Sequence, residues 1–220
     1  MKIDILTLFP EMFSGPFSES IIKRALDEGK VTLTIHNLRN WSTDRYKTVD
    51  GRPFGGGAGM VMRVDVIDRA VEEIKKENEE LKDSQKVVLL DTKGEMYKQK
   101  KVIEFSRLDH LILICGHYEG IDHRVHMHIA DEVICIGPYV LTGGELPAMV
   151  VVDSVIRLLP QVISKDSLKE ESFESGVNVE YPQYTRPSEY KGWKVPEVLL
   201  GGNHKEIKKW RVEKGKELSS

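Results

Sequence analysis

Cysteines are scarce in this chain of 220 residues, which contains Cys115 and Cys135 and no others. Each lies within an apolar run, so both are expected to be small buried side chains rather than a disulfide or a metal-binding pair. The low cysteine content favours a reducing compartment, and we expect the protein to work in the cytoplasm. With 40% hydrophobic and 30% charged residues, the composition excludes a wholly disordered or fibrous chain.

Long apolar runs are also missing. Stretches such as Leu111–Cys115 are far shorter than the roughly 18 residues that a membrane-spanning helix needs. The N-terminal segment carries Asp4 within its apolar stretch and Pro10 soon after it, unlike a secretory signal. The sequence therefore predicts neither a membrane span nor secretion.

Three common catalytic motifs are absent. The chain has no His-Glu-x-x-His and no Gly-x-Ser-x-Gly, and no Gly-Lys-Ser/Thr follows the glycine-rich residues 54–59. Zinc peptidases, serine hydrolases and P-loop proteins therefore receive no support. His123, His126 and His128 lack further ligands at a recognised spacing, so we expect solvent-facing helix histidines and no metal site.

Positive charge is unevenly distributed. The chain has 32 Lys and Arg against 35 Asp and Glu, a net charge of −3, yet residues 191–220 carry eight basic and four acidic side chains. Residues 39–63 carry five basic side chains against two acidic ones. An acidic chain with two basic segments is compatible with selective binding of a nucleic acid and excludes indiscriminate coating of it.

The pattern of apolar residues predicts an α/β domain in which a parallel sheet carries helices on both faces. Expected strands are 2–9, 31–38, 87–90, 111–115 and 133–136, and expected helices are 17–28, 64–81, 97–108, 120–131 and 147–159. Lys93-Gly94 is predicted to be a turn. Residues 161–176, rich in Ser, Glu and Lys, are expected to be a flexible linker between residues 1–160 and a small segment at 177–220 that contains a short basic helix.

Two glycine loops follow buried strands. Residues 116–120 (Gly-His-Tyr-Glu-Gly) and 139–145 (Tyr-Val-Leu-Thr-Gly-Gly-Glu) both lie just beyond a strand's carboxyl end, where open α/β sheets bind ligands. Glycine at such turns is often structural alone. Because these loops also carry Tyr, Glu and Thr, and are expected to follow adjacent strands, a shared ligand site is the better explanation. The glycine-rich residues 54–59 are interpreted equally well as a surface loop or as an anion contact.

Read together, the motifs resemble the bacterial tRNA (guanine-N1)-methyltransferase family of the SPOUT superfamily. The resemblance runs nearly end to end and is most specific in Tyr-Glu-Gly-Ile-Asp (118–122) and Leu-Thr-Gly-Gly-Glu-Leu-Pro-Ala (141–148). It implies a deep trefoil knot in the α/β domain and a homodimer whose active sites are built from both subunits. It also implies transfer of a methyl group from S-adenosyl-L-methionine to N1 of the guanine that follows the anticodon, position 37 of tRNA.

The resemblance also implies which residues form the site. The cofactor-binding positions would be Gly116, Glu119, Ile136, Gly137, Tyr139, Val140, Leu141, Gly143 and Gly144, with Glu119 facing the methionine end. The tRNA-binding positions would be Asp50, Gly55, Gly56, Gly57, Gly59 and Arg186. Magnesium is implied for the family as well, although the sequence shows no cage of carboxylates for it.

The catalytic roles follow from the substrate together with the resemblance. N1 of guanine carries a proton at neutral pH, so methyl transfer needs a base there and stabilisation of charge at O6. Glu171 aligns with the family's catalytic Asp and is predicted to be the base, and Arg157 is predicted to be the cation near O6. Taken singly, each of these side chains would be interpreted as a solvated surface charge.

Several positions depart from the family's pattern, and two alternatives stay open. Pro138 and residues 91–93 differ near the cofactor site, His117 and Gly51 differ near the tRNA-facing surface, and the chain ends at Ser220, so the C-terminal tRNA-binding segment is expected to be shortened. One alternative is a methyltransferase acting on another RNA site. The other is an RNA-binding dimer of the same fold without catalytic activity.

Overall fold

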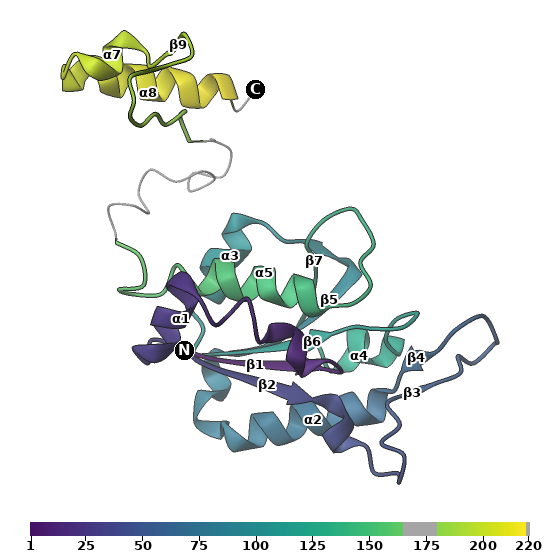
Figure 1. Ribbon diagram of the computed structural model, residues 1–220. Coiled ribbons are helices and arrows are strands. Elements are labelled where there is room, and N and C mark those ends of the chain that lie inside the picture. Colours follow the sequence, from purple (N-terminus) through teal and green to yellow (C-terminus); the bar gives the residue numbers. More distant parts are fainter. Residues whose placement is uncertain (165–179, 219–220) are drawn as a thin grey trace. The chain divides into compact units, whose positions relative to one another are not determined.

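The computed structural model describes residues 1–164 and 180–218, and the chain divides into two compact units, Met1–Ile163 and Ser164–Ser220. The first unit is built around a single five-stranded sheet, and the described part of the second is small and contains two helices and a short hairpin (Figure 1). Within the described residues, no helix is both long enough and apolar enough to cross a membrane.

The central sheet is entirely parallel, with its strands in the order β2-β1-β6-β5-β7. The strands are β1 (Lys2–Thr7), β2 (Thr32–Asn37), β5 (Gln85–Met96), β6 (His110–Cys115) and β7 (Glu132–Cys135). Every residue of β6 is buried, because a parallel sheet covered on both faces surrounds its middle strand with apolar side chains. The predicted α/β class with a parallel sheet is confirmed.

Helices cover both faces of the sheet (Figure 1). One face carries α1 (Ser20–Asp27), α3 (Gln99–Phe105) and α5 (Glu145–Ile156), and the other carries α2 (Val64–Glu77) and α4 (His123–His128). Successive residues of β5 supply both cores, since Val88 and Leu90 pack with the first group of helices and Val87 and Leu89 with the second. This two-sided packing explains the continuous apolar runs in the sequence.

Short elements complete the first unit. They are the 3-10 helices η1 (Pro10–Phe13), η2 (Leu38–Trp41) and η3 (Glu79–Ser84), and the antiparallel strands β3 (Asp50–Gly51) and β4 (Val61–Met62). Strands β3 and β4 bracket the glycine-rich residues 54–59. Met62 also forms a parallel bridge with Ile121, beyond the end of β6, so the glycine-rich loop is tied to the loop that follows β6.

Two features of the sheet differ from the sequence-based expectation. Lys93 and Gly94 do not form a turn but lie in a bulge of β5, where the register with β7 shifts between Leu90 and Glu95. A Cβ atom on Gly94 would lie 2.5 Å from the backbone nitrogen of Ile134, so glycine permits the bulge to rest on β7. In addition, β6 and β7 are not adjacent, because β5 lies between them.

The second unit has four described elements, the strands β8 (Glu189–Tyr190) and β9 (Trp193–Lys194) and the helices α7 (Glu197–Leu200) and α8 (His204–Leu218). Lys191 and Gly192 both have positive φ angles and make the tight turn of the hairpin. The hairpin and α7 were not expected from the sequence. The predicted linker, 161–176, lies mostly outside the described residues.

Candidate active site

A cavity of about 200 Å³ opens at the carboxyl ends of β5, β6 and β7. Its walls come from residues 90–93, 116–120, 134–137 and 139–144, with Pro147 at the start of α5. All nine positions predicted for the cofactor line this one cavity: Gly116, Glu119, Ile136, Gly137, Tyr139, Val140, Leu141, Gly143 and Gly144. The two glycine loops therefore converge even though β5 separates their strands, because all three strands end at the same edge of the sheet.

Close backbone contact holds the two loops together. The backbone N–H of Gly144 donates to the carbonyl of Gly116 at 2.8 Å. A Cβ atom on Gly144 would lie 2.6 Å from Cα of Cys115 and 2.7 Å from the nitrogen of Gly116. No side chain fits there, so glycine at this position is required by packing against the end of β6 rather than by its φ angle, which is −82°.

A buried carboxylate stands behind these loops. Glu145, the first residue of α5, is 2% exposed and accepts a hydrogen bond from the hydroxyl of Thr7 at 2.7 Å. Its position in the first turn of α5 also suits a negative charge. Burial, together with the charge of Glu145, raises the pKa of the Cys115 thiol well above its ordinary value. Cys115 is therefore a neutral packing residue and not a nucleophile.

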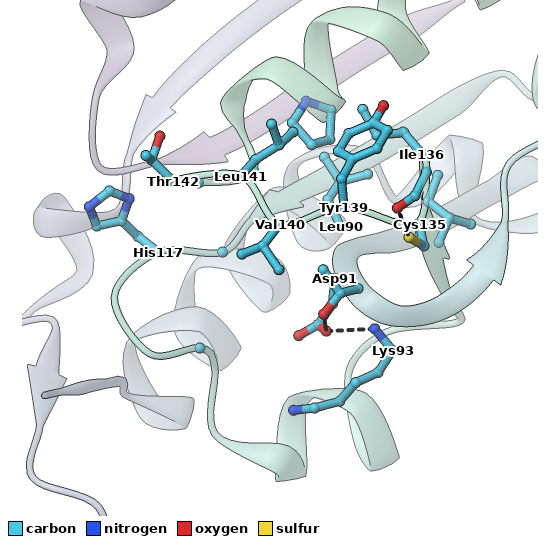
Figure 2. A pocket seen from close by; sticks show the side chains of 18 of the residues that line it. Leu90, Asp91, Lys93, His117, Cys135, Ile136, Tyr139, Val140, Leu141 and Thr142 are labelled. Atoms are coloured by element: carbon cyan, nitrogen blue, oxygen red, sulfur yellow. Dashed lines mark hydrogen bonds between the residues drawn. The ribbon is translucent and has the colours of Figure 1, made fainter. Parts of the chain in front are cut away.

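The cavity is apolar along one side and polar across from it. Figure 2 shows Tyr139, Val140 and Leu141 along one side, with Asp91 and Lys93 facing them. The side chains of Tyr139 and Val140 are 54% and 87% exposed. Because the loop leaves these apolar groups uncovered at the edge of a cavity, it suits a flat, partly apolar ligand.

Glu119 connects the cavity with the glycine-rich loop. Its backbone N–H donates to the carbonyl of Met60 at 3.1 Å, and its side chain lies against the Cα of Gly59, where a Cβ would collide with it. Gly59 also has a φ angle of +77°, so two independent reasons call for glycine there. The loop predicted to contact tRNA is thus fixed beside the cavity.

The other predicted tRNA-binding positions are open to solvent or lie elsewhere. Gly55, Gly56 and Gly57 have positive φ angles and are exposed, and Asp50 lies in β3, which precedes this loop in the chain. Arg186 belongs to the second unit and lines a surface hollow there with Tyr184 and Leu200, among others.

A second loop beside β3 is held by one carboxylate. Asp44 accepts hydrogen bonds from the hydroxyls of Ser42 and Thr48 at 2.7 and 2.9 Å, and from the backbone N–H of Tyr46 at 2.9 Å. The bonds from Ser42 and Thr48, led by Ser42, lower the pKa of Asp44 far below its ordinary value. The loop therefore has a defined shape, with the side chain of Tyr46 83% exposed at its tip.

The structure places two histidines of the site in environments that differ from the sequence-based prediction. His117, expected on the tRNA-facing surface, lines the cavity, and its Nδ1 atom is buried without a hydrogen-bond partner in the described structure. His126, expected to face solvent, is instead 7% exposed, and its Nε2 atom lies 3.1 Å from the carboxylate of Asp91. His123 and His128 are exposed, as expected.

Of the two predicted catalytic residues, the structure describes only Arg157, which it does not bring to the cavity. Arg157 is the C-cap of α5, about 20 Å from Gly144 along the helix at a rise of 1.5 Å per residue. It is half-buried and does not line the cavity. Glu171 lies outside the described residues. Among the residues that are described, no group of three or more His, Cys, Asp or Glu could hold a metal ion, so the structure offers no ready protein cage for magnesium.

Comparison with known proteins identifies the family. A family model described as tRNA (Guanine-1)-methyltransferase TrmD matches residues 1–219. The chain is 53% identical to a tRNA (guanine-N(1)-)-methyltransferase of Dictyoglomus turgidum over 96% of this chain and 83% of that protein. It is 52% identical to the enzyme of the same name from Chloroflexus aggregans, over 96% of this chain and 81% of that protein. A match of this extent shows that the chain belongs to the tRNA (Guanine-1)-methyltransferase TrmD family.

Proposed function

We propose that this protein transfers a methyl group from S-adenosyl-L-methionine to N1 of the guanine at position 37 of tRNA, in the cytoplasm. The observation that carries the proposal is the cavity at the ends of β5, β6 and β7, in which loops separated in the sequence meet. Membership of the TrmD family supports the same substrate and the same reaction.

The residues around the cavity fit the cofactor. The buried, unpartnered Nδ1 of His117 calls for a polar ligand atom, and the carboxylate of Glu119 suits the ammonium of the methionine end. Ile136, Gly137 and residues 139–141 form one wall, and we assign their backbone N–H and C=O groups to the adenine. When bound, S-adenosylmethionine supplies a methyl group on a positively charged sulfur.

The protein's own part in the chemistry is to orient the guanine and to manage its proton. Glu171 is proposed to accept the N1 proton and Arg157 to stabilise negative charge at O6. No metal ion is needed to activate N1, because deprotonation alone makes it nucleophilic. Magnesium, if required, would be held partly by water and RNA rather than by the described residues.

The position of Arg157 supports a site completed by a second subunit. In one chain, α5 separates Arg157 from the cavity by its whole length. The same helix buries Val151 and Val152 on one side and leaves Leu146 and Val150, one turn apart on the other, 49% and 45% exposed. Large apolar side chains that gather uncovered on one helix face often mark a protein interface. We therefore propose that this face of α5 is the interface of a homodimer.

Two further features belong to the proposal because they follow from the family. They are the deep trefoil knot of the first unit and the tRNA-binding role of the second unit. In support of the last, Arg211 stacks on Tyr181 with 4.6 Å between guanidinium and ring centre, and Trp193 is 72% exposed beside Lys194. Of these groups, Trp193 and Lys194 are exposed, and an exposed aromatic side chain beside a basic one suits RNA.

The test is transfer of labelled methyl from S-adenosylmethionine to an unmodified tRNA transcript with guanines at positions 36 and 37. A matched transcript has the guanine at position 37 replaced. We expect label in the first transcript alone, with loss of transfer but retained cofactor binding in Glu171→Ala and Arg157→Ala.

Other outcomes separate the alternatives. Label in both transcripts would favour a different RNA site, and nuclease mapping would locate it. Binding of tRNA without label in either transcript would contradict the proposal in favour of an RNA-binding dimer without catalytic activity. Full activity of both variants would overturn the roles of Glu171 and Arg157 while leaving the reaction intact.

A further inference from the structure

An acidic side chain lies in the wall of the cavity at the bulge of β5. Asp91 follows Leu90, the last residue of β5 in register with both neighbouring strands. Its side chain is 12% exposed, and it lines the cavity across from Val140 (Figure 2). The bulge at residues 91–94 turns this carboxylate toward the cavity at the place where a regular strand would continue past it.

Three hydrogen bonds hold the carboxylate in place, and the longest of them runs from the hydroxyl of Thr92 to Oδ1 at 3.5 Å. The backbone N–H of Lys93 donates to Oδ1 of Asp91 at 2.9 Å, and the imidazole of His126 lies with Nε2 at 3.1 Å from Oδ2. His126 is 7% exposed, so the ring is itself fixed by packing. A carboxylate has about four acceptor positions, of which Oδ1 of Asp91 uses two and Oδ2 uses one here. An acceptor position on Oδ2 therefore stays available for a ligand.

The hydrogen-bonding groups of S-adenosylmethionine can each be assigned a partner on the cavity wall. Its ammonium suits Glu119, and its adenine suits the backbone of residues 136–141, as proposed above. The ribose joins these two ends, and its vicinal hydroxyls are the donors that lack a partner in this assignment. Asp91 is an acceptor at the carboxyl end of a parallel strand, the position from which acidic residues bind ribose hydroxyls in other α/β folds.

We propose that Asp91 binds the ribose hydroxyls of the cofactor and that His126 is the positioning residue that orients it. This inference rests on the proposed function and adds to it a specific recognition group in this chain. It also gives a role to the one histidine of α4 that is turned away from solvent.

The experiment measures binding by titration calorimetry, without turnover. The ligands are S-adenosylhomocysteine and its 2′-deoxy and 3′-deoxy analogues, and the proteins are the full-length wild type, Asp91→Ala and Asp91→Asn. In the wild type, loss of the bonded hydroxyl is expected to weaken binding about 10- to 100-fold, as for a hydrogen bond to a charged group. In Asp91→Ala the affinity for S-adenosylhomocysteine should fall by a similar factor. The deoxy analogues are expected to bind this variant with affinities within about 2-fold of that value.

Controls separate this role from a general loss of structure. Glu95→Ala removes an exposed acidic residue that directly follows the bulge and does not line the cavity, and this variant should discriminate between the ligands as the wild type does. His126→Phe should lose part of the discrimination, and His126→Gln, which keeps a donor, should recover it. Thermal unfolding of each variant verifies the fold, and Asp91→Asn provides a second variant of nearly the same shape.

Two results would overturn the proposal, and they differ from each other. If removing a ribose hydroxyl lowers the affinity by the same factor in the wild type and in both Asp91 variants, Asp91 does not bind the ribose. The assignment of the cavity to the cofactor then stands. If the wild type does not bind S-adenosylhomocysteine at all, the proposed function fails and the ribose role fails with it.

Discussion

The hydroxyl of Thr7, at the end of β1, donates a 2.7 Å hydrogen bond to the carboxylate of Glu145, the first residue of α5, and both side chains are buried. The same hydroxyl oxygen accepts a bond from the backbone N–H of Phe9 at 2.9 Å. A strand and a helix 138 residues apart in the sequence are thereby joined directly behind the loop of Gly143 and Gly144. The loop of Gly143 and Gly144 is therefore held in place by a contact between two residues that do not themselves line the cavity.

Replacing Thr7 with valine should destabilise the protein. The variant keeps the shape of the side chain but leaves the buried carboxylate of Glu145 without this donor, a cost of about 1–3 kcal/mol. Thr7→Ser keeps the hydroxyl and should lose much less. Urea unfolding at one fixed protein concentration measures both variants, and equal stability of Thr7→Val and the wild type would show that Glu145 does not depend on this bond.

Gly144→Ala should disrupt the cavity. Its Cβ would lie 2.6 Å from Cα of Cys115, closer than real Cβ contacts come, so the loop or the end of β6 must move. We expect binding of S-adenosylhomocysteine to weaken at least about 10-fold, since small displacements at a site are costly. Gly15→Ala is the control, because nothing lies within 4 Å of a Cβ there. Unchanged binding in Gly144→Ala would contradict the packing argument.

Features carried by local sequence were largely predictable. The five strands of the sheet follow from apolar runs such as Leu111–Cys115, and the helices follow from their spacing of apolar residues. That the loops after β6 and β7 meet could be expected as well, because parallel strands end at one edge of a sheet. The positions of all nine predicted cofactor residues on one cavity agree with that expectation.

Features set by contacts distant in the sequence were not predictable. The placement of β5 between β6 and β7 depends on strand pairing, for which a single sequence has no signal. Likewise, His123, His126 and His128 look alike in the sequence, and only the position of α4 against the bulge of β5 turns His126 toward Asp91. The burial of Glu145 depends on Thr7, which nothing in the motif around Glu145 indicates.

A buried ion cluster at the other end of β1 predicts a pH dependence of stability. Asp4 is 1% exposed and lies 2.6 Å from both His110 and His36. Burial alone would raise the pKa of Asp4, but the hydrogen bonds from His110 and His36 outweigh it and hold that pKa well below the ordinary value. Because the folded-state pKa is below the unfolded one, the stabilisation is present above the unfolded-state pKa of about 3.9 and is lost as the pH falls below it.

Asp4→Asn should therefore cost about 2–4 kcal/mol of unfolding free energy at pH 7, and the difference from the wild type should shrink between about pH 5 and pH 3. Urea unfolding of both proteins across this pH range measures the difference in their unfolding free energies. Asp27→Asn, which removes an exposed partner of Lys23, should have little effect at any pH. A difference that stays constant with pH would show that Asp4 does not titrate in this way.

The loop held by Asp44 should contribute to tRNA binding through its charges. Arg45 and Lys47 flank Tyr46 at its tip, and Asp44 fixes the backbone around them. Each cation that contacts a phosphate contributes about 1 to the slope of log affinity against log salt. Lys47 has a φ angle of +55°, so Lys47→Asn, which tolerates that conformation, is the suitable variant.

We expect Arg45→Gln combined with Lys47→Asn to reduce the salt slope of tRNA binding by about 2 and to raise the KM for tRNA while kcat changes little. Filter binding at several salt concentrations gives the slope. Lys76→Gln, on the acidic outer face of α2 beside Glu72 and Glu73, is the matched control and should leave the slope unchanged. A reduced kcat at an unchanged slope would place the loop in catalysis and not in phosphate contact.

A site shared between subunits predicts complementation. Glu119 lines the cavity, whereas Arg157 lies at the far end of α5 in the same chain. Glu119→Gln and Arg157→Ala should each be inactive as homodimers. A heterodimer of the two variants, purified through two different tags, has one cavity with an intact Glu119 that faces an intact Arg157 from the other subunit, so it should recover about half of the wild-type activity. If Arg157 instead served its own chain, both sites of the heterodimer would carry a defect and no activity would return.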